Sequence, residues 1–221
     1  GYIVPVFFLD TNVAGNADKD RQLTKYLYGG DNKYRLPQEI ILGIGGVRIL
    51  RDLGYNTIDK YHMNEGHAAL GTLELYDQSN DVEKVRQQCV FTTHTPVAAG
   101  HDQFDLNLAK AMIGKILPEF ILDDISFENK LNMTRLALFF SHYINGVAKK
   151  HGEVSRMMFP GYSIDSITNG VHSATWVTEP FQRIFDKHIP GWRSDPNSLR
   201  AASGMDKTEI WNAHSEAKRE L

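Results

Sequence analysis

The residues best suited to chemistry in this sequence stand directly after short apolar runs. Glu65 and His67 follow one run, His94 follows a second and Asn169 follows a third. Imidazole and amide groups donate and accept hydrogen bonds, a carboxylate accepts them, and hardly any lysine or arginine accompanies these groups. Such neutral or mildly acidic groups suit sugar hydroxyls better than phosphates or nucleic acid.

Each of these strand-end residues also has a purely structural interpretation. Asn64 could cap a following helix, His94 could be a buried histidine with backbone partners, and Thr168–Gly170 could form a simple turn. For any one of them alone, the structural role is favoured. Because three polar strand ends occur together, and ligands bind beyond the carboxyl ends of strands in open α/β sheets, the pattern favours a binding site.

Nine histidines invite a metal site, but their spacing argues against one. His62 and His67 are five positions apart, and His94 and His101 are seven apart, so neither pair has the i, i+4 spacing of helical zinc ligands. No clustered carboxylates accompany these histidines, and no Gly-x-Ser-x-Gly motif indicates a serine nucleophile. The sequence therefore predicts neither a metal centre nor a serine triad.

The elements that must position these residues alternate between strand and helix. The apolar runs are short and rich in β-branched residues, as in strands that are covered on both faces. Alternation with helical patterns predicts an α/β fold with a Rossmann-like, mostly parallel sheet and flanking helices. The predicted strands are Val4–Leu9, Thr57–Met63, Cys89–Thr93 and Ser163–Thr168, and the predicted helices are Pro37–Leu53, His67–Gln78, Leu106–Leu117 and Asn132–Phe159.

The most regular helical pattern is Asn132–Phe159, in which apolar residues recur every three or four positions until Pro160. It contains Asn145-Gly146, a pair typical of hairpins, but its flanks keep the helical period. Gly43–Gly46 falls inside another helical pattern and does not complete a dinucleotide-binding fingerprint. Close helix packing is therefore the favoured role of these glycines, with phosphate binding as the alternative.

The chain beyond residue 170 is predicted to differ from the part before it. Three prolines make the region after Val177 irregular, and Asp206–Leu221 then resumes a polar amphipathic helix. We expect a boundary or domain crossover near Gly170, which separates residues 1–170 from residues 171–221. The chain starts at Gly1 without a methionine or leader and stops within a helical pattern, which predicts an internal fragment of a longer protein.

Composition places the chain among ordinary globular proteins. With 42% hydrophobic and 23% charged residues and a net charge of -3, it gives no electrostatic reason to expect a nucleic-acid partner. No apolar run approaches the roughly 20 residues needed to span a bilayer, so we expect no membrane partner and a cytoplasmic location. The single cysteine, Cys89, stands in an apolar stretch and is expected to be a buried structural thiol.

Five long strings then carry a resemblance to a known family. They are LYGGDNKYRLPQEIILGIGG at 27–46, YHMNEGHAAL at 61–70, FTTHTPVAAGHDQF at 91–104, NMTRLALFFSHYINGVAKKHGEVSRMMF at 132–159 and ITNGVHSATWV at 167–177. In this order they resemble the α-glucan phosphorylases, which include the glycogen, starch and maltodextrin phosphorylases, and most of all the shorter prokaryotic form. The resemblance covers nearly all of this chain but only part of a complete family member.

The resemblance implies a fold and an activity. The fold is the two-domain GT-B type of glycosyltransferases, with the active site between two Rossmann-like domains. Residues 1–170 would be part of the N-terminal domain, and residues 171–221 would form the crossover and the beginning of the C-terminal domain region. The activity is phosphorolysis of terminal α-1,4-glucosidic bonds to glucose 1-phosphate with retention, aided by pyridoxal phosphate. The implied partners are an α-1,4-glucan, inorganic phosphate, the remainder of the same polypeptide and, in a homodimer, a second copy of it. The lysine that attaches the cofactor is implied to lie outside this chain, so the chain alone is expected to be inactive.

Site residues follow from the resemblance position by position. His94 matches the histidine whose main-chain carbonyl lies against the reacting glucosyl unit, where its dipole would stabilise an oxocarbenium-like transition state. Asn169 matches an asparagine that hydrogen-bonds glucose, and Val147 matches a residue that lines the same pocket. Trp176 matches a tryptophan near the cofactor.

Four further residues are implied to contact the substrate. Asp31 and Asn32 match a loop that gates the site, and two glycines before them suggest that this loop is mobile without ligand. Glu65 and His67 match polar residues near the catalytic subsite, although some relatives carry aspartate in place of Glu65. Two alternatives remain open: a glycosyltransferase of the nucleotide-sugar glycogen synthase type, against which ITNGVHSATW argues, and a non-catalytic glucan-binding module.

Overall fold

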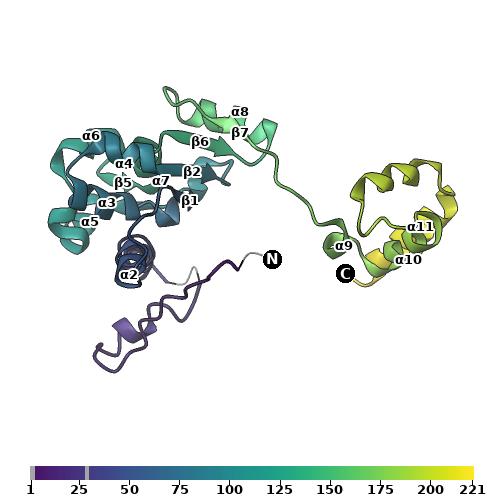
Figure 1. Cartoon of the computed structure of the whole chain (residues 1–221), viewed down its shortest axis with the longest axis horizontal. Coiled ribbons are helices and arrows are strands. Elements are labelled where there is room, and N and C mark those ends of the chain that lie inside the picture. The colour runs from purple at the N-terminus through teal and green to yellow at the C-terminus, as the bar shows by residue number, and fades with distance from the viewer. Residues whose placement is uncertain (1–2, 28–29) are drawn as a thin grey trace. The chain divides into compact units, whose positions relative to one another are not determined.

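The computed structural model describes residues 3–27 and 30–221 and forms two compact units. The larger unit ends at Thr168 and the smaller one begins at Asn169. The larger unit has an α/β fold, and the smaller one is built from helices (Figure 1). None of the helices in these described ranges is long and apolar enough to cross a bilayer.

A parallel four-stranded sheet forms the centre of the larger unit. Its strands are closely in register, because Asn64 lies opposite Thr92 and Thr93 lies opposite Gly146. The carboxyl ends of these strands therefore meet at one edge, and the predicted parallel α/β sheet with flanking helices is confirmed. In spatial order the strands are β1 (Tyr61–Asn64), β2 (Cys89–Thr93), β6 (Tyr143–Gly146) and β7 (Asp165–Ser166).

Helices and a small second sheet surround the central sheet. Phe91 of β2 is fully buried, as are Leu73 and Leu136 of two flanking helices, so the core lies between sheet and helices. A three-stranded antiparallel sheet pairs β3 (Gln103–Asp105) with β5 (Lys130–Asn132) and β5 with β4 (Ser126–Phe127). The helices are α1 (Asn32–Ile40), α2 (Gly46–Asp52), α3 (Gly71–Ser79), α4 (Val82–Gln88), α5 (Leu106–Ile113), α6 (Leu122–Ile125), α7 (Met133–Phe139) and α8 (Lys149–Met158).

The single long helix predicted over Asn132–Phe159 is wrong. The segment instead forms α7, the sheet strand β6 and α8. Ile144 of this strand lies opposite Phe91, which draws the middle of the segment into the sheet. The helical period survives in the sequence because a four-residue strand is too short to break the spacing of the two helices around it. Asn145 and Gly146 therefore end a strand.

The strand predicted at Val4–Leu9 also does not form. Val4 and Phe8 have exposed fractions of 78% and 91%, and the segment is extended without a partner strand among the described residues. An apolar, β-branched run favours a strand, but a strand is stable only when a neighbour supplies hydrogen bonds and covers its faces. The strands predicted at Thr57–Met63 and Ser163–Thr168 do form but are shorter than predicted: β1 starts at Tyr61 and ends at Asn64, one residue beyond the predicted end, and β7 has two residues.

Gly43 shows why glycines occur in the first helical segment. A π-helix (Ile41–Gly45) connects α1 to α2, and an ideal Cβ on Gly43 would lie 2.5 Å from the backbone nitrogen of Gly71 in α3. No side chain fits in that space, so the close packing expected for these glycines is confirmed at this position.

The smaller unit is more regular than predicted. Its helices are α9 (Ser173–Trp176), α10 (Glu179–His188) and α11 (Lys207–Arg219), so the region after Val177 is not irregular throughout. Pro180 lies in the first turn of α10, where its missing N–H needs no partner. The helix predicted over Asp206–Leu221 is confirmed as α11. Arg183 of α10 pairs with Glu216 of α11 at 2.5 Å.

Candidate functional site

Three predicted site residues emerge at the carboxyl edge of the parallel sheet. Glu65 follows β1, His94 follows β2 and Val147 follows β6. Because these three strands are neighbours in register, their carboxyl ends place the residues side by side. The edge therefore combines residues that are distant in sequence.

Glu65 makes the densest set of contacts at this edge. Its Oε2 accepts hydrogen bonds from the backbone N–H of His94 at 2.7 Å and from Thr95 Oγ1 at 2.8 Å. Its Oε1 accepts from the backbone N–H of Gly66 at 3.1 Å, and its own N–H donates to the carbonyl of Thr92 at 2.9 Å. The side chain thus joins the end of β1 to the segment that follows β2.

The backbone of Glu65 is strained. Its φ of 71° and ψ of 170° fall in a region that is normally occupied by glycine. Such a conformation costs of order 1–3 kcal/mol for a residue with a side chain, and it persists only where the surroundings enforce it. Strain of this kind clusters at functional sites, which makes Glu65 a candidate for a functional role.

A hydrogen-bonded relay crosses the sheet just before this edge. His62 Nε2 lies 2.7 Å from Thr92 Oγ1, and Thr92 Oγ1 donates to Asn145 Oδ1 at 2.9 Å. Since the hydroxyl has one proton, which it gives to Asn145, the His62 nitrogen must be the donor in its contact. Asn145 Nδ2 then donates to the carbonyl of Gly146 at 3.2 Å. The relay therefore connects the neighbouring strands β1, β2 and β6 side chain to side chain.

A histidine of α8 fixes the backbone of Val147. Its backbone N–H donates to His151 Nδ1 at 3.2 Å, which requires that nitrogen to be free of a proton. An ideal Cβ on Gly146 would lie 2.6 Å from the same His151 nitrogen. A glycine at 146 is therefore needed for the imidazole to reach the Val147 backbone.

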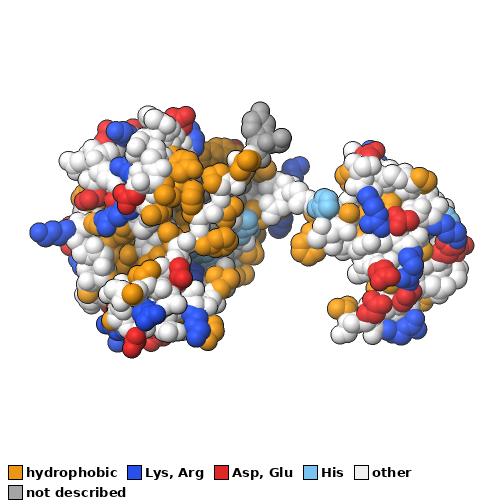
Figure 2. Space-filling model, turned by 60° about the horizontal axis from the view of Figure 1, so that its bottom comes forward, with side chains coloured by type: hydrophobic (Ala, Val, Ile, Leu, Met, Phe, Trp, Pro, Cys, Tyr) orange, Lys and Arg blue, Asp and Glu red, His pale blue; other side chains and the backbone are white. Residues whose placement is uncertain are grey.

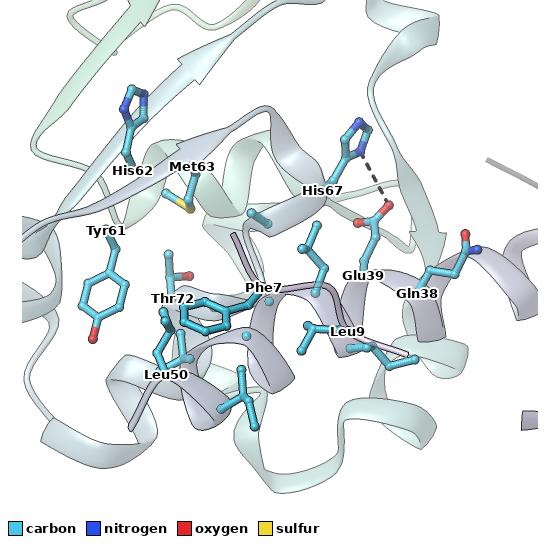
Figure 3. Close-up of a pocket in the computed structure, with 18 of the residues that line it drawn as sticks. Phe7, Leu9, Gln38, Glu39, Leu50, Tyr61, His62, Met63, His67 and Thr72 are labelled. Atoms are coloured by element: carbon cyan, nitrogen blue, oxygen red, sulfur yellow. Dashed lines mark ion pairs between the residues drawn. The ribbon is translucent and has the colours of Figure 1, made fainter. Parts of the chain in front are cut away.

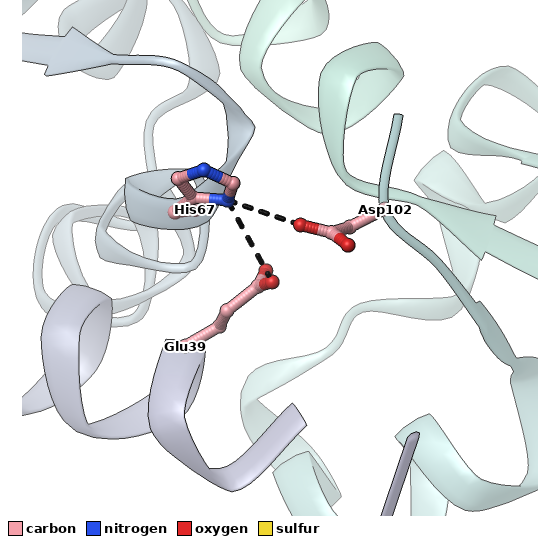
Figure 4. A group of neighbouring side chains, drawn as sticks. All are labelled: Glu39, His67 and Asp102. Carbon is pink, nitrogen blue, oxygen red and sulfur yellow. Dashed lines mark hydrogen bonds and ion pairs between the residues drawn. The ribbon is translucent and has the colours of Figure 1, made fainter. Parts of the chain in front are cut away.

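His67 belongs to a second polar group beside the edge (Figure 4). Its Nδ1 lies 3.0 Å from Asp102 Oδ2 and 2.8 Å from Arg35 Nη2. A guanidinium nitrogen only donates, so His67 Nδ1 either accepts from Arg35 or donates to Asp102, but not both at once. Arg35 also contacts Asp102 at 3.0 Å and Glu39 at 3.3 Å. We call Arg35, Glu39, His67 and Asp102 the charged cluster.

The two carboxyl groups of the charged cluster differ in protonation. Burial, reinforced by the negative charge of Asp102, raises the pKa of Glu39 to about 9, and the nearby Arg35 only partly offsets this. Burial also raises the pKa of Asp102, but hydrogen bonds with His67, Glu39 and Arg35 outweigh it and hold that pKa well below its usual range. At neutral pH, Arg35 and Asp102 therefore form the ion pair and Glu39 keeps its proton.

Glu39, His67 and Asp102 also satisfy the spacing of a three-ligand cation site, because their ligand atoms lie within 4.8 Å of one another. The expectation that no carboxylates cluster around the histidines is therefore wrong at His67. Arg35 Nη2 lies within hydrogen-bonding distance of both His67 and Asp102, where a bound cation would stand. The geometry fits an arginine-centred ion-pair network rather than a metal centre.

A large cavity, of about 830 Å³, opens on the charged cluster but not on Glu65, His94 or Val147. Figure 3 shows Glu39 and His67 at one end of it and Tyr61 and Leu50 at the other. Hydrophobic side chains gather on this face of the larger unit (Figure 2), and most of the lining is aliphatic or aromatic. Such a lining fits a packing surface better than a sugar site.

Asp31 and Asn32 do not lie on an open loop. The Asp31 side chain accepts from the N–H groups of Lys33 and Tyr34 at 3.0 and 3.1 Å, which makes it the N-cap of α1. Asn32 is the first residue of that helix, and its Nδ2 is 3.5 Å from the carbonyl of Gln103. The predicted loop is therefore wrong from residue 32 onward, and Gly29 lies outside the described residues.

The remaining predicted site residues belong to the smaller unit. Asn169 is exposed and begins it, and Trp176 ends α9 with 76% of its surface exposed. Neither residue belongs to the unit that carries the carboxyl edge of the sheet. Their proposed roles remain predictions.

Of the charged cluster, only His67 was predicted from the sequence. Arg35 and Glu39 are spaced i, i+4 on one helix face, and this spacing is the local signal that could have revealed the pair. Asp102 stands in the string GHD, but its contact with Arg35 bridges 67 positions in sequence. No periodicity encodes such a contact.

The larger unit therefore has a Rossmann-like parallel α/β sheet with flanking helices, and polar residues stand at its carboxyl edge. No family model matches it. It is 36% identical over 245 positions to the maltodextrin phosphorylase of Thermococcus litoralis, which covers 99% of this chain. Glycogen phosphorylases of Mycobacterium tuberculosis and Aquifex aeolicus are 33% and 29% identical and cover 99% and 98% of the chain.

The chain belongs to the α-glucan phosphorylase family and corresponds to a segment of it. It spans 29%, 30% and 35% of the length of these three relatives, respectively. The match to the Thermococcus enzyme extends over 245 positions, more than the 221 residues of this chain, so that relative carries additional residues within the matched region.

Proposed function

We propose that this chain forms the donor-sugar side of an α-glucan phosphorylase active site. The observation that carries this proposal is the segment after β2, which Glu65 fastens through the N–H of His94 at 2.7 Å. The His94 carbonyl oxygen has no hydrogen-bond donor among the described residues, so it remains available to a substrate. A fixed carbonyl dipole favours positive charge, as in the oxocarbenium-like transition state of glycosyl transfer.

The proposed reaction is phosphorolysis of a terminal α-1,4-glucosidic bond, which yields glucose 1-phosphate with retention. In this proposal His94 faces the reacting glucosyl unit, Val147 lines its pocket and Asn169 binds a glucose hydroxyl. His67 and the start of α1 at Asp31 and Asn32 border the subsite. The proposed whole enzyme has a GT-B fold, in which the second domain closes the cleft. The family names of the relatives and the hydrogen-bonding groups at the carboxyl edge support this.

Pyridoxal phosphate is the cofactor implied for a complete phosphorylase, where it supplies acid–base chemistry through its phosphate. The carboxyl-edge segments 61–67, 92–95 and 145–147 contain no lysine or arginine. Lys60, the one lysine that lines the large cavity, instead donates to the carbonyl of Gln87. The residues at this edge therefore do not fit attachment of the cofactor, and the proposal assigns them to the sugar alone.

The remainder of the polypeptide is the proposed partner of the exposed apolar surface around the large cavity. Ile3, Phe8 and Leu27 are 94%, 91% and 80% exposed, and Phe8 and Leu27 line the large cavity together with mainly apolar side chains. Exposed apolar surface of this extent marks a packing interface. Because the relatives are about three times as long as this chain, additional polypeptide is the favoured occupant.

Two assays test the proposal. The full-length protein that contains this segment should form glucose 1-phosphate from maltodextrin and inorganic phosphate, whereas the 221-residue chain should not and should show no absorbance band of bound cofactor. Glucosyl transfer from a nucleotide sugar without phosphorolysis would favour the glycogen synthase type. Maltodextrin binding without either reaction would favour a non-catalytic glucan-binding module.

A further inference from the structure

Glu65 directs its carboxylate to the chain itself. Both oxygens accept hydrogen bonds from residues 66, 94 and 95, at 2.7 to 3.1 Å. A carboxylate offers about four lone-pair positions, and three of them are occupied by these donors. The interpretation of Glu65 as a substrate-binding residue therefore has little support in its contacts.

The Glu65 carboxylate holds the chain on both sides of the His94 main-chain carbonyl. The His94 N–H precedes the His94 carbonyl along the chain, and the Thr95 side chain follows it, and both donate to the same Glu65 oxygen. With both neighbours fixed, the carbonyl between them has little freedom to rotate. Loss of the carboxylate would release both anchors together.

Glu65 is itself firmly placed. Its N–H donates to the Thr92 carbonyl, which ties it to the sheet, and its φ of 71° and ψ of 170° keep the side chain directed across the edge toward β2. Glycine would adopt this backbone conformation without strain, but it would supply no carboxylate. The strain at position 65 is thus coupled to the presence of the bracing group.

We propose, resting on the proposed phosphorylase function, that Glu65 is a positioning residue that orients the His94 main-chain carbonyl toward the reacting glucosyl unit. It acts through the His94–Thr95 segment and does not contact the sugar. Positioning errors of about 1 Å can reduce turnover on the order of a hundred-fold, so its removal is expected to lower kcat roughly ten- to a hundred-fold.

The first test measures the brace in the 221-residue chain, independently of activity. The amide proton of His94 should resonate far downfield because it donates to a carboxylate. It should shift upfield in Glu65→Gln and Glu65→Gly, because the glutamine amide has one oxygen for three donors and glycine has none. The amide of Leu108, which donates to Asp105 at 3.0 Å, is an internal control that should not shift.

The second test measures kinetics in the full-length enzyme. Glu65→Ala and Glu65→Gly should lower kcat to a similar extent with little change in the KM for glucan, although the glycine variant relieves the strain and should fold better than the alanine variant. Glu65→Asp keeps the carboxylate on a shorter side chain and should recover part of the lost kcat. Asp81→Ala is the matched control, because Asp81 also accepts a backbone hydrogen bond, from Lys84 at 3.0 Å, but only caps α4.

The outcomes separate the possibilities. An unshifted His94 amide in Glu65→Gln would overturn the brace itself. A rise in KM with kcat preserved would show that Glu65 binds sugar directly. A shifted amide with unchanged kcat and KM would show that the brace has no role in the reaction. Absence of phosphorolysis in the unmodified full-length enzyme would instead refute the proposed function, while the amide shift would still decide whether the brace exists.

Discussion

Replacement of Glu39 by glutamine tests the unequal protonation of the charged cluster. Glu39 is 1% exposed, and burial together with Asp102 raises its pKa to about 9, so in the native state it keeps a proton that the unfolded chain releases above a pKa of 4.5. Unfolding therefore releases a proton in this range, and the free energy of unfolding falls as pH rises from about 5 to about 9. The glutamine side chain of the variant would resemble the protonated glutamate and would not titrate.

The size of the effect follows from the pKa values. A difference of one proton bound changes the free energy of unfolding by about 1.4 kcal/mol per pH unit. Between about pH 5.5 and 8.5 the unmodified chain should lose up to about 4 kcal/mol relative to Glu39→Gln, since almost the whole interval lies between 4.5 and about 9. The two proteins should have similar stability near pH 5, and the variant should be clearly more stable at about pH 8.5.

The two units can be followed separately in this assay. All nine tyrosines belong to the larger unit and all three tryptophans to the smaller one, so tyrosine absorbance during urea unfolding reports on the unit that contains Glu39. Glu153→Gln is the matched control, because a hydrogen bond and ion pair with Lys150 lower the pKa of Glu153 and place its titration below the tested range. Parallel stability curves for the unmodified chain and Glu39→Gln would refute the reasoning.

Three further predictions concern packing, the sugar contact and the start of α1. Gly43→Ala should destabilise the larger unit by about 1–3 kcal/mol, measured by tyrosine absorbance, because its Cβ would lie 2.5 Å from a backbone atom; Gly46→Ala, with open space at its Cβ, should be tolerated. Asn169→Ala in the full-length enzyme should lower kcat/KM about five- to a hundred-fold if its amide binds a glucose hydroxyl, whereas unchanged kinetics would leave it a turn residue. Hydrogen exchange at residues 30 and 31, which precede α1, should slow when maltodextrin and phosphate bind the full-length enzyme, and unchanged exchange would remove the gating role.

The sequence predicts the parts of the fold that depend on local pattern. The apolar run Cys89–Thr93 forms the strand β2 with the predicted bounds, because continuous burial on both faces leaves a continuous apolar signal. Val4–Leu9 carries a similar signal but lacks a partner strand among the described residues. The strand β6 was not predicted because the helical spacing of apolar residues in α7 and α8 continues across it. Pairing between distant segments decides both cases, and local pattern does not contain it.

The candidate site divides in the same way. Polar residues after strands are visible in the sequence, so Glu65 and His94 could be chosen as site residues. The direction in which the Glu65 side chain points could not be predicted, because no residue pattern encodes a φ of 71° at a glutamate. The charged cluster joins α1, the turn after β1 and the segment before β3, and its members become neighbours only when the chain has folded.

The distribution of charge near the carboxyl edge indicates which of the two proposed substrates, glucan or phosphate, this part of the enzyme would bind. Arg35 is the cation of the charged cluster, and Asp102 at 3.0 Å balances its charge while Glu39 remains neutral. A phosphate dianion requires positive charge that is not already balanced, whereas sugar hydroxyls require donors and acceptors such as the His94 carbonyl. If phosphorolysis is the reaction, this edge is suited to the glucosyl unit, and the groups that bind phosphate must come from other parts of the enzyme. Catalysis would then depend on how accurately the two sides meet, which is why a brace on the His94 segment should affect turnover more than sugar affinity.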